Sequence, residues 1–348
     1  MQLPIHSIHK ELGAKFIEFY GWEMPLQYSS ILDEHMAVRK GVGIFDVSHM
    51  GDIKVSGRDA IKFTQFLQVN NIERARVGEM KYSFVLNENG GILDDLVLYK
   101  MEDGIFFVPN ASTTEKIYEW FKEKSVGYDV EVENVSNKYI CFAIQGQKAE
   151  VVLQKIINYD LKKIKFFCFF EIDDMLISRS GYTGEDGFEI IANVENALEL
   201  WEKIMNAGKE EKIKPCGLGA RDSLRIEKGF LLSGQDFDEE RTPVETNAFW
   251  AVKLDHDFIG KKKTIEKMNE KHDVFVGIEM INGIPRKGFE IYNSSLIGHI
   301  TSGTYSPVLK KGIGLGYVSS GYENVGTNVK VLIRGKKEKG RIVKLPFV

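Results

Sequence analysis

The feature that most constrains this chain is a change of pattern near residue 272. From there to residue 348, short β-type runs such as VFVGIEM, IGHITSG and GIGLGYV recur between turns rich in glycine and asparagine, and helical periodicity is absent. Several short strands at such spacing are typical of a small all-β barrel or sandwich. We therefore predict an all-β domain over residues 272–348, with the lysine-rich stretch 261–272 as its linker.

The preceding part of the chain mixes helical and strand periods. Ser30 with Asp33 predicts the start of a helix, and Ser112 with Glu115 has the spacing of a capping box for a second. A third helix is predicted over residues 217–229, where a glycine ends it. Because the regular strand–helix alternation of a parallel sheet is missing, the pattern favours an α+β fold with antiparallel sheets.

Composition and charge exclude several classes of protein. The 348 residues are 43% hydrophobic and carry a net charge of −4, so no overall positive field attracts nucleic acid or an anionic membrane. The three cysteines are far apart in sequence, which argues against a disulfide framework and a zinc site. The first residues lack the apolar core of a signal peptide, and the longest apolar runs are too short to span a bilayer. We expect a cytoplasmic protein with neither a membrane nor a nucleic-acid partner.

Two adjacent aspartates, Asp94 and Asp95, interrupt an otherwise apolar strand. We predict a hairpin here, whose two strands are KYSFVL and ILDDLVLYK and whose turn is the asparagine- and glycine-rich NENGG. Neighbouring side chains of a strand point to opposite faces, so Asp95 shares a face with Leu93, Val97 and Tyr99, and Asp94 points to the other. The two carboxylates therefore cannot form a shared-proton pair. At least one is partly buried and needs a donor or a cation. A structural acid satisfied by turn backbone and a functional acid both remain open.

The other glycine-rich segments do not match phosphate-binding loops. GYTGEDGFE, residues 181–189, precedes a strand-like run rather than a helix, so we predict a long hairpin loop that ends with Glu189 on a strand. CGLGARD leads into a helix, and its Arg221 falls in the first turn, where a cation is unfavourable against the helix dipole. Arg221 is either paired with a nearby anion or an ordinary surface arginine. In FDVSHMG, His49 is predicted to be a hydrogen-bonded core histidine. These patterns alone name no substrate.

At these same residues the sequence resembles the T-protein, or aminomethyltransferase, family of the glycine cleavage system. The matching stretches follow in order from about residue 11 to residue 347 and are too long to match by chance. The main ones are HMAVRKGVGIFDVSHMG (35–51), YSFVLNENGGILDDLVLYK (82–100), SRSGYTGEDGFE (178–189), GLGARDSLRIEKGFLLSGQDFDEERTPVE (217–245) and WAVKLDHDFIGKK (250–262).

The resemblance implies a fold and a reaction. It implies a three-lobed molecule, with two α+β lobes around a tetrahydrofolate channel over residues 1–262 and a C-terminal β-barrel over residues 272–348. The implied partner is the lipoylated H-protein, whose aminomethyl group supplies one carbon to tetrahydrofolate. The products are 5,10-methylenetetrahydrofolate and ammonia. Tetrahydrofolate is thus a co-substrate, and no metal is implied.

The resemblance also implies roles for individual residues. Asp95 matches the carboxylate that faces the reacting nitrogens of the folate, where it stabilises the positive charge that develops during carbon transfer. Glu189 would accept the two parallel N–H donors of the pterin edge, and Arg221 would pair with a carboxylate, either Asp95 or a ligand group. The positions that match folate-binding residues are Met50, Tyr82, Asn110, Tyr182, Glu189, Arg221 and Trp250.

Two related functions share the folate site. One is a tetrahydrofolate-dependent demethylase, which accepts a methyl or methylamine donor. The other is a non-catalytic folate-binding maturation factor, whose relatives carry a cysteine where this chain has Phe230 in EKGFLLSGQ. The chain departs from the usual family pattern at a few positions near the site, among them Pro109, Thr246 and Asn247.

Overall fold

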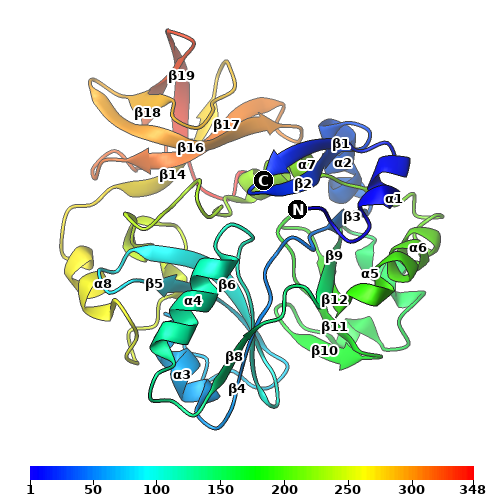
Figure 1. Ribbon diagram of the computed structural model, residues 1–348. Coiled ribbons are helices and arrows are strands. Elements are labelled where there is room, and N and C mark those ends of the chain that lie inside the picture. The colour runs from blue at the N-terminus through cyan, green and yellow to red at the C-terminus, as the bar shows by residue number, and fades with distance from the viewer. The chain divides into compact units, whose positions relative to one another are not determined.

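The computed structural model describes all residues from 1 to 348 and has the α+β fold, the antiparallel sheets and the C-terminal barrel predicted from the sequence (Figure 1). The chain divides into two compact units. The first unit comprises Met1–Gln65, Asn71–Tyr82 and Leu96–Asp222. The second unit comprises Phe66–Asn70, Ser83–Asp95 and Ser223–Val348.

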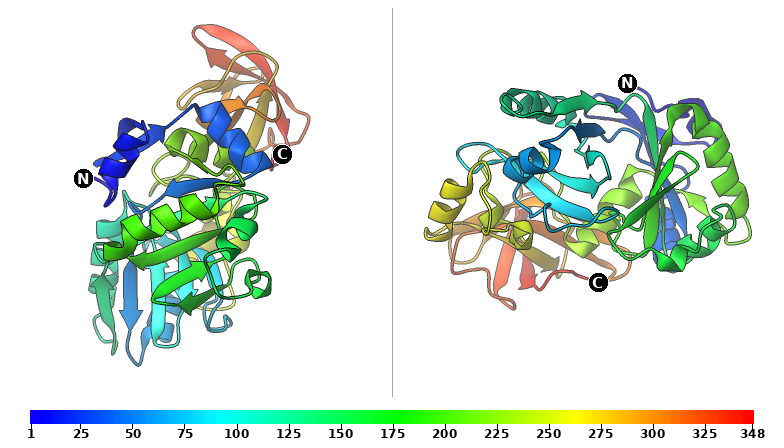
Figure 2. Two further views of the ribbon diagram at one scale, coloured as in Figure 1. Left: turned by 90° about the vertical axis from the view of Figure 1, so that its right-hand side faces the viewer. Right: turned by 90° about the horizontal axis from the view of Figure 1, so that it is seen from below.

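A six-stranded sheet forms one part of the first unit. Helices α5 and α6 cover one of its faces (Figures 1 and 2), and Phe142, Ile190 and Trp201 are among the side chains buried between them. All its strand pairs are antiparallel except the short parallel pair of β3 and β13. In spatial order the strands are β10 (Phe169–Ile172), β11 (Met175–Ser178), β12 (Gly187–Asn193), β9 (Tyr139–Gln145), β3 (Gly43–Asp46) and β13 (Lys214–Pro215). The helices are α5 (Ala149–Gln154) and α6 (Ala197–Ala207).

A second, five-stranded sheet contains the predicted double-aspartate hairpin. A buried cluster that includes Tyr99 and Phe106 from this sheet and Leu176 and Ile191 from the six-stranded sheet packs the two sheets against each other within the first unit. The spatial order is β5 (Met80–Leu86), β6 (Ile92–Lys100), β7 (Gly104–Val108), β4 (Ile53–Ser56) and β8 (Glu131–Asn134). The pair β1 (Lys15–Phe19) and β2 (Trp22–Gln27) belongs to the first unit. Short 3-10 turns lie at Leu161–Lys163 and Val194–Asn196.

Of the two helix starts predicted from serine residues in the first unit, one is confirmed and the other is wrong. Helix α2 (Ile31–Lys40) begins as predicted, because the Ser30 hydroxyl accepts a hydrogen bond from the Asp33 backbone N–H at 3.1 Å. The capping box predicted at Ser112 is wrong: helix α4 (Thr114–Lys124) begins after Thr113, which makes no side-chain cap. The Thr113 and Thr114 hydroxyls instead donate to the Asn110 carbonyl oxygen. The remaining helices are α1 (His6–Glu11) and α3 (Ala60–Leu67).

The C-terminal residues of the second unit form a closed six-stranded barrel, in which all the pairs are antiparallel (Figure 1). Its interior is a cluster of buried aliphatic side chains that includes Ile278, Ile291 and Val331. Around the barrel the strands are β14 (Val274–Met280), β17 (Lys311–Val318), β16 (Leu296–Ser306), β15 (Glu290–Tyr292), β18 (Asn328–Ile333) and β19 (Lys336–Val343). The lysine-rich stretch predicted as a linker is instead mostly helix α8 (Lys261–Met268), and only residues 269–273 lead from it to β14.

Helix α7 (Leu218–Lys228) ends at Gly229 as predicted, and Gly229 has a φ of +72°. In the second unit the fully buried Arg225 donates to Asp236 at 2.5 Å and to the Ser302 hydroxyl of β16 at 2.7 Å. This ion pair fixes the C-terminal half of α7 to the barrel. Two further 3-10 turns lie at Pro243–Glu245 and Phe249–Ala251.

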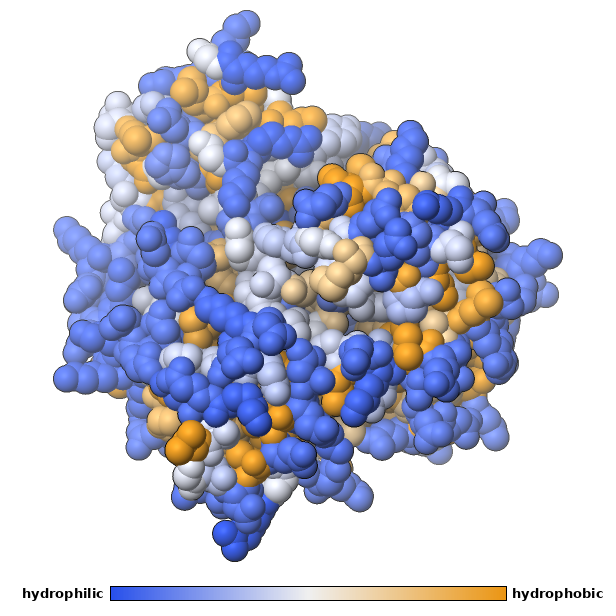
Figure 3. Space-filling view, in the orientation of Figure 1, coloured by the Kyte–Doolittle hydropathy of each residue, from blue (hydrophilic) through white to orange (hydrophobic).

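The surface in view in Figure 3 is covered mainly by hydrophilic side chains, with apolar side chains in small separate patches. None of the helices combines the length and the apolar character that a membrane crossing requires.

Candidate active site

The two aspartates of β6 have different surroundings, as strand alternation predicts. Asp94 is fully buried, on the same face as Ile92 and Leu96. Asp95 is only half-buried, and so is Val97 on the same face. The Asn87 side chain accepts from the backbone N–H groups of residues 89 and 91, and its backbone pairs with residues 90 and 91. The turn therefore pairs the backbone N–H groups of residues 87, 89, 90 and 91 within itself.

The loop GYTGEDGFE takes its shape from close packing on Gln145. A Cβ at Gly181 would lie 1.9 Å from the Gln145 Oε1, and one at Gly187 would lie 2.5 Å from its Nε2. Gln145 donates to the Ser180 carbonyl oxygen at 2.9 Å and accepts from the Thr183 hydroxyl at 2.8 Å. The loop joins β11 to β12 as predicted, and its glycines leave space for this packing rather than for a phosphate.

Glu189 lies on β12, as predicted, at the end of a chain of hydroxyl groups. Ser180 donates to Glu189 Oε2 at 2.5 Å, and Ser180 is in turn 2.8 Å from the Ser178 hydroxyl. The Tyr99 hydroxyl lies 3.4 Å from Ser178. Because both serines and the tyrosine are buried, the Glu189 carboxylate is held in one orientation while the residue itself stays half-buried. No hydrogen bond within the protein occupies the other oxygen, Oε1, which is available to a ligand.

Arg221 lies in the first turn of α7, as predicted, with its guanidinium 4.7 Å from the centre of the Tyr182 ring. A cation at this distance over an aromatic face is attracted by the ring quadrupole.

Burial, and then the positive charge of Arg221, lower the pKa of His49 to about 3. His49 is buried as predicted, and its Nδ1 has no hydrogen-bond partner.

A small pocket borders Arg221 on the side of β2 and β3 and is also lined by Tyr28 and Asp46. A buried histidine joins these two residues: His9 Nδ1 is 2.9 Å from the Tyr28 hydroxyl, and His9 Nε2 is 2.9 Å from Asp46 Oδ2. Desolvation, followed by the charge of Asp46, raises the pKa of Tyr28 far above its ordinary value. Tyr28 is therefore a neutral hydroxyl on this wall of the pocket.

Met50 and Asn110 lie on neighbouring segments of the first unit. Both are half-buried, and the Gly51 backbone N–H donates to the Pro109 carbonyl oxygen at 3.1 Å. A Cβ at Gly51 would lie 2.2 Å from the Thr114 hydroxyl, so the two segments pack closely. Tyr82, also half-buried, lies in β5 of the same unit.

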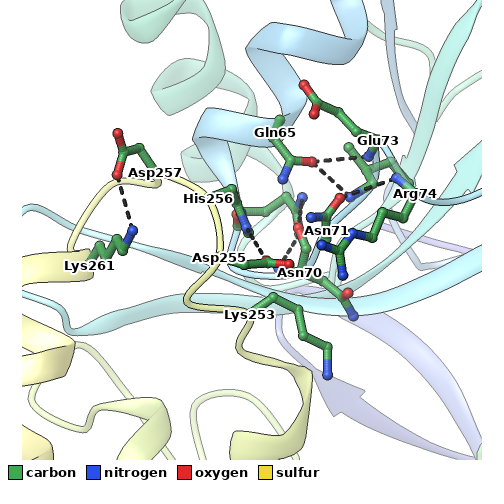
Figure 4. Close-up of polar contacts among 12 residues, drawn as sticks. Gln65, Asn70, Asn71, Glu73, Arg74, Lys253, Asp255, His256, Asp257 and Lys261 are labelled. Carbon is green, nitrogen blue, oxygen red and sulfur yellow. Dashed lines mark hydrogen bonds and ion pairs between the residues drawn. The ribbon is translucent and has the colours of Figure 1, made fainter.

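The remaining predicted residue, Trp250, belongs to the second unit and is 62% exposed, which is unusual for a tryptophan. It lies in the 3-10 turn before a loop in which His256 is 3.6 Å from Asp255 and Lys261 is 3.1 Å from Asp257 (Figure 4).

Sequence reasoning missed the residues that hold Glu189, and it missed Asp52, a buried acid that follows β3. Ser180 gave a weak signal, because it alternates with Ser178 just before the glycine-rich loop. Asp52 is an acid between apolar residues in HMGDIKV, the same signal that led to Asp95. The Tyr99 end of the hydroxyl chain and the Ser136 partner of Asp52 come from segments 79 and 84 residues away in sequence, which no local pattern reveals.

Comparison with protein families places the whole chain in one group. Residues 5–256 match the GCVT N-terminal domain, and residues 274–348 match the glycine cleavage T-protein C-terminal barrel domain. A protein from Thermoanaerobacter sp. (strain X514), named aminomethyltransferase, is 46% identical over 99% of this chain and 96% of its own length. A protein of the same name from Geobacillus sp. (strain WCH70) is 46% identical over 99% of this chain and 97% of its own.

A solved structure is similar over the full length as well. The crystal structure of glycine cleavage system aminomethyltransferase T from Bartonella henselae has a TM-score of 0.95 and 34% sequence identity. The match covers 100% of this chain and 98% of that one.

Proposed function

Since the chain belongs to the glycine cleavage T-protein family of aminomethyltransferases, we infer that its substrates are an aminomethylated lipoyl group and tetrahydrofolate. The lipoyl group is carried by H-protein. The enzyme transfers the one-carbon unit to tetrahydrofolate, and ammonia and 5,10-methylenetetrahydrofolate leave.

The observation that carries the folate assignment is the fixed carboxylate of Glu189. Ser180 engages one carboxylate oxygen at 2.5 Å and so sets the plane of the group. The amino-pyrimidinone edge of a pterin presents two parallel N–H donors, and a carboxylate accepts such a pair well when its orientation is fixed beforehand. In Glu189, Oε1 is open for these donors and Oε2 keeps a second lone pair besides the one used by Ser180.

Arg221 and Tyr182 supply the flat, positively charged part of the site. The Arg221 guanidinium lies 4.7 Å from the centre of the Tyr182 ring, and its planar group of N–H donors suits an oxygen acceptor. We propose that this acceptor is a carboxylate or a carbonyl oxygen of the folate or of the protein. Pre-positioned donors of this kind lower the entropy cost of binding.

Asp95 supplies the charge needed during transfer. When the lipoyl thiol leaves, positive charge develops on the carbon–nitrogen unit that is being transferred. A fixed carboxylate in a site with little water stabilises that charge, and it accepts a proton from the folate amine in general-base fashion. Its half-buried position on β6 fits this role better than the fully buried Asp94 does.

We expect Glu189→Ala and Arg221→Ala each to weaken tetrahydrofolate binding by about tenfold to a hundredfold, the usual loss when a hydrogen bond to a charged group is removed. Isothermal titration calorimetry measures this directly. The matched control is Glu195→Ala, which removes an exposed carboxylate near the end of the same strand and should leave the affinity unchanged. Wild-type affinity in both site variants would refute this folate site.

A further inference from the structure

Asp52 is a buried carboxyl group that no protein group satisfies. Its exposed fraction is 6%, and its backbone is fixed: the N–H donates to the Ser136 hydroxyl and the carbonyl oxygen accepts from Val135, both at 2.9 Å. No side chain or backbone N–H donates to the carboxyl oxygens, which are nevertheless not fully enclosed. Part of their surface is therefore accessible. A buried carboxylate without a donor is costly, so such a group is normally neutral or bound to a ligand.

Asp52 belongs to the same polar cluster as Glu189. After burial, the charges of Glu189 and Asp52 both raise the pKa of the Cys141 thiol, and both also contribute to the raised pKa of Tyr99. The two carboxyl groups thus lie near the same thiol and the same phenol, between the two sheets of the first unit. Only Glu189 has a donor within the protein, Ser180.

The neighbours of Asp52 are residues already assigned to the folate site. Met50 is two positions away in sequence, and the intervening Gly51 is hydrogen-bonded to Pro109, the residue before Asn110. Gly51 also packs on Thr114, which in turn donates to the Asn110 carbonyl oxygen. These contacts hold the segment that carries Asp52 against the segment of residues 109–114.

We propose that Asp52 is a further substrate-binding residue, whose protonated carboxyl group donates a hydrogen bond to a carbonyl oxygen or ring nitrogen of the bound pterin. The proposal rests on the folate assignment above and adds a second contact of opposite polarity. Glu189, as a carboxylate, accepts hydrogen bonds from N–H groups, whereas a neutral carboxylic acid donates one to an acceptor. A pterin carries both kinds of group, so the two acids would recognise different atoms of the ring system.

Ionisation of Asp52 would abolish this donor, which makes binding sensitive to pH. Burial raises the pKa of Asp52 to about 8. The pKa of His49 is lowered to about 3, and those of Cys141 and Tyr99 are raised well above their ordinary values. None of these three groups titrates near the pKa of Asp52. The charged or titratable groups around this cluster are Asp46, His49, Tyr99, Cys141, Glu189 and Arg221.

The test is tetrahydrofolate affinity, measured by calorimetry from about pH 6.5 to about pH 9.5. Above the pKa of Asp52, the protonated fraction that can donate a hydrogen bond falls about tenfold per pH unit. The tetrahydrofolate affinity of the wild-type protein should therefore fall above about pH 8. Asp52→Asn keeps a neutral donor of similar shape and should bind equally well across the range. Asp52→Ala should bind about tenfold more weakly already at pH 7, because the donor is gone. Asp103→Asn, at an exposed acid paired with Lys54, is the matched control and should follow the wild type.

The possible outcomes separate the two proposals. If Asp52→Asn shows the same fall in affinity as the wild type, or if Asp52→Ala binds with wild-type affinity, the role of Asp52 is overturned while the folate site stands. If the wild-type protein binds no tetrahydrofolate at any pH, the proposed function itself fails.

Thermal unfolding gives a second readout. The pKa of Asp52 is higher in the folded protein than in the unfolded chain. Its stabilising contribution is therefore lost as pH rises from about 4 to about 8. That loss of stability should be absent in Asp52→Asn. If the unfolding temperature of Asp52→Asn and that of the wild type depend on pH in the same way, the proposal is contradicted.

Discussion

Replacing Asp95 with asparagine is expected to lower turnover about 10²–10³-fold, the usual effect of removing one pre-organised electrostatic group. Asparagine has nearly the same shape but cannot balance a developing positive charge or accept a proton. Because Asp95 is half-buried, its substitution should leave folding intact. Tetrahydrofolate binding should also be retained, since we assign recognition of the pterin to Glu189 and Arg221. Single-turnover measurement of carbon transfer from aminomethylated H-protein, with calorimetry of folate binding, checks both parts.

Asp94→Asn is the matched control, one residue away on the opposite face of β6. Asp94 is fully buried, so its substitution should lower the thermal unfolding midpoint and leave turnover per folded molecule within a few-fold of wild type. The comparison isolates the chemistry of one carboxylate from the general effect of losing an acid in this strand. Wild-type turnover in Asp95→Asn would show that Asp95 is a structural residue.

The second large effect concerns the buried ion pair of the second unit. Arg225→Met should destabilise the protein by about 3–5 kcal/mol, because it leaves Asp236 buried without its cation. Asp236 would keep hydrogen bonds from Thr301, Ser302 and the Leu232 backbone N–H, which are neutral donors and do not balance its charge. Chemical denaturation followed by tryptophan fluorescence and circular dichroism measures the loss.

Two further variants show whether the charge is the cause. The double replacement Arg225→Met with Asp236→Leu removes both charges and should recover much of the stability, since apolar side chains often replace a buried pair without loss. Arg58→Met removes an arginine whose pair with Asp129 is exposed, and it should have little effect. If Arg225→Met is as stable as Arg58→Met, the buried pair does not hold α7 to the barrel.

Much of the fold was predictable because its signals are local. The strands after residue 272 are short and regularly separated by turns, which led to the barrel. The Asn87 turn and the alternation of β6 gave the hairpin and the different environments of Asp94 and Asp95. The cap at Ser30 was correct for the same reason, since the side chain and its backbone partner are three residues apart.

The errors arose where tertiary contacts outweigh local preference. Ser112 has the spacing of a capping residue, yet the chain is held at Asn110 by two threonine hydroxyls, and the helix begins later. The lysine-rich stretch read as a linker is a helix with an intrahelical ion pair between Lys263 and Glu266.

The candidate site was only partly predictable from the residues themselves. Physical reasoning singled out Asp95 and Arg221, and the family resemblance supplied the other positions. The hydroxyl chain behind Glu189 depends on pairing between β9, β11 and β12, and Asp52 is held by Val135 and Ser136, so both bring distant segments together. Long-range pairing of this kind leaves no mark on any short stretch of sequence.

Ammonia release tests the central claim most directly. The purified protein is offered aminomethyl-lipoyl H-protein and tetrahydrofolate, each alone and both together, and ammonia and 5,10-methylenetetrahydrofolate are quantified. The account predicts that both products form rapidly and in equal amounts only when both substrates are present. Absence of ammonia, together with methyl transfer to tetrahydrofolate from a methylated amine, would contradict it and identify a demethylase.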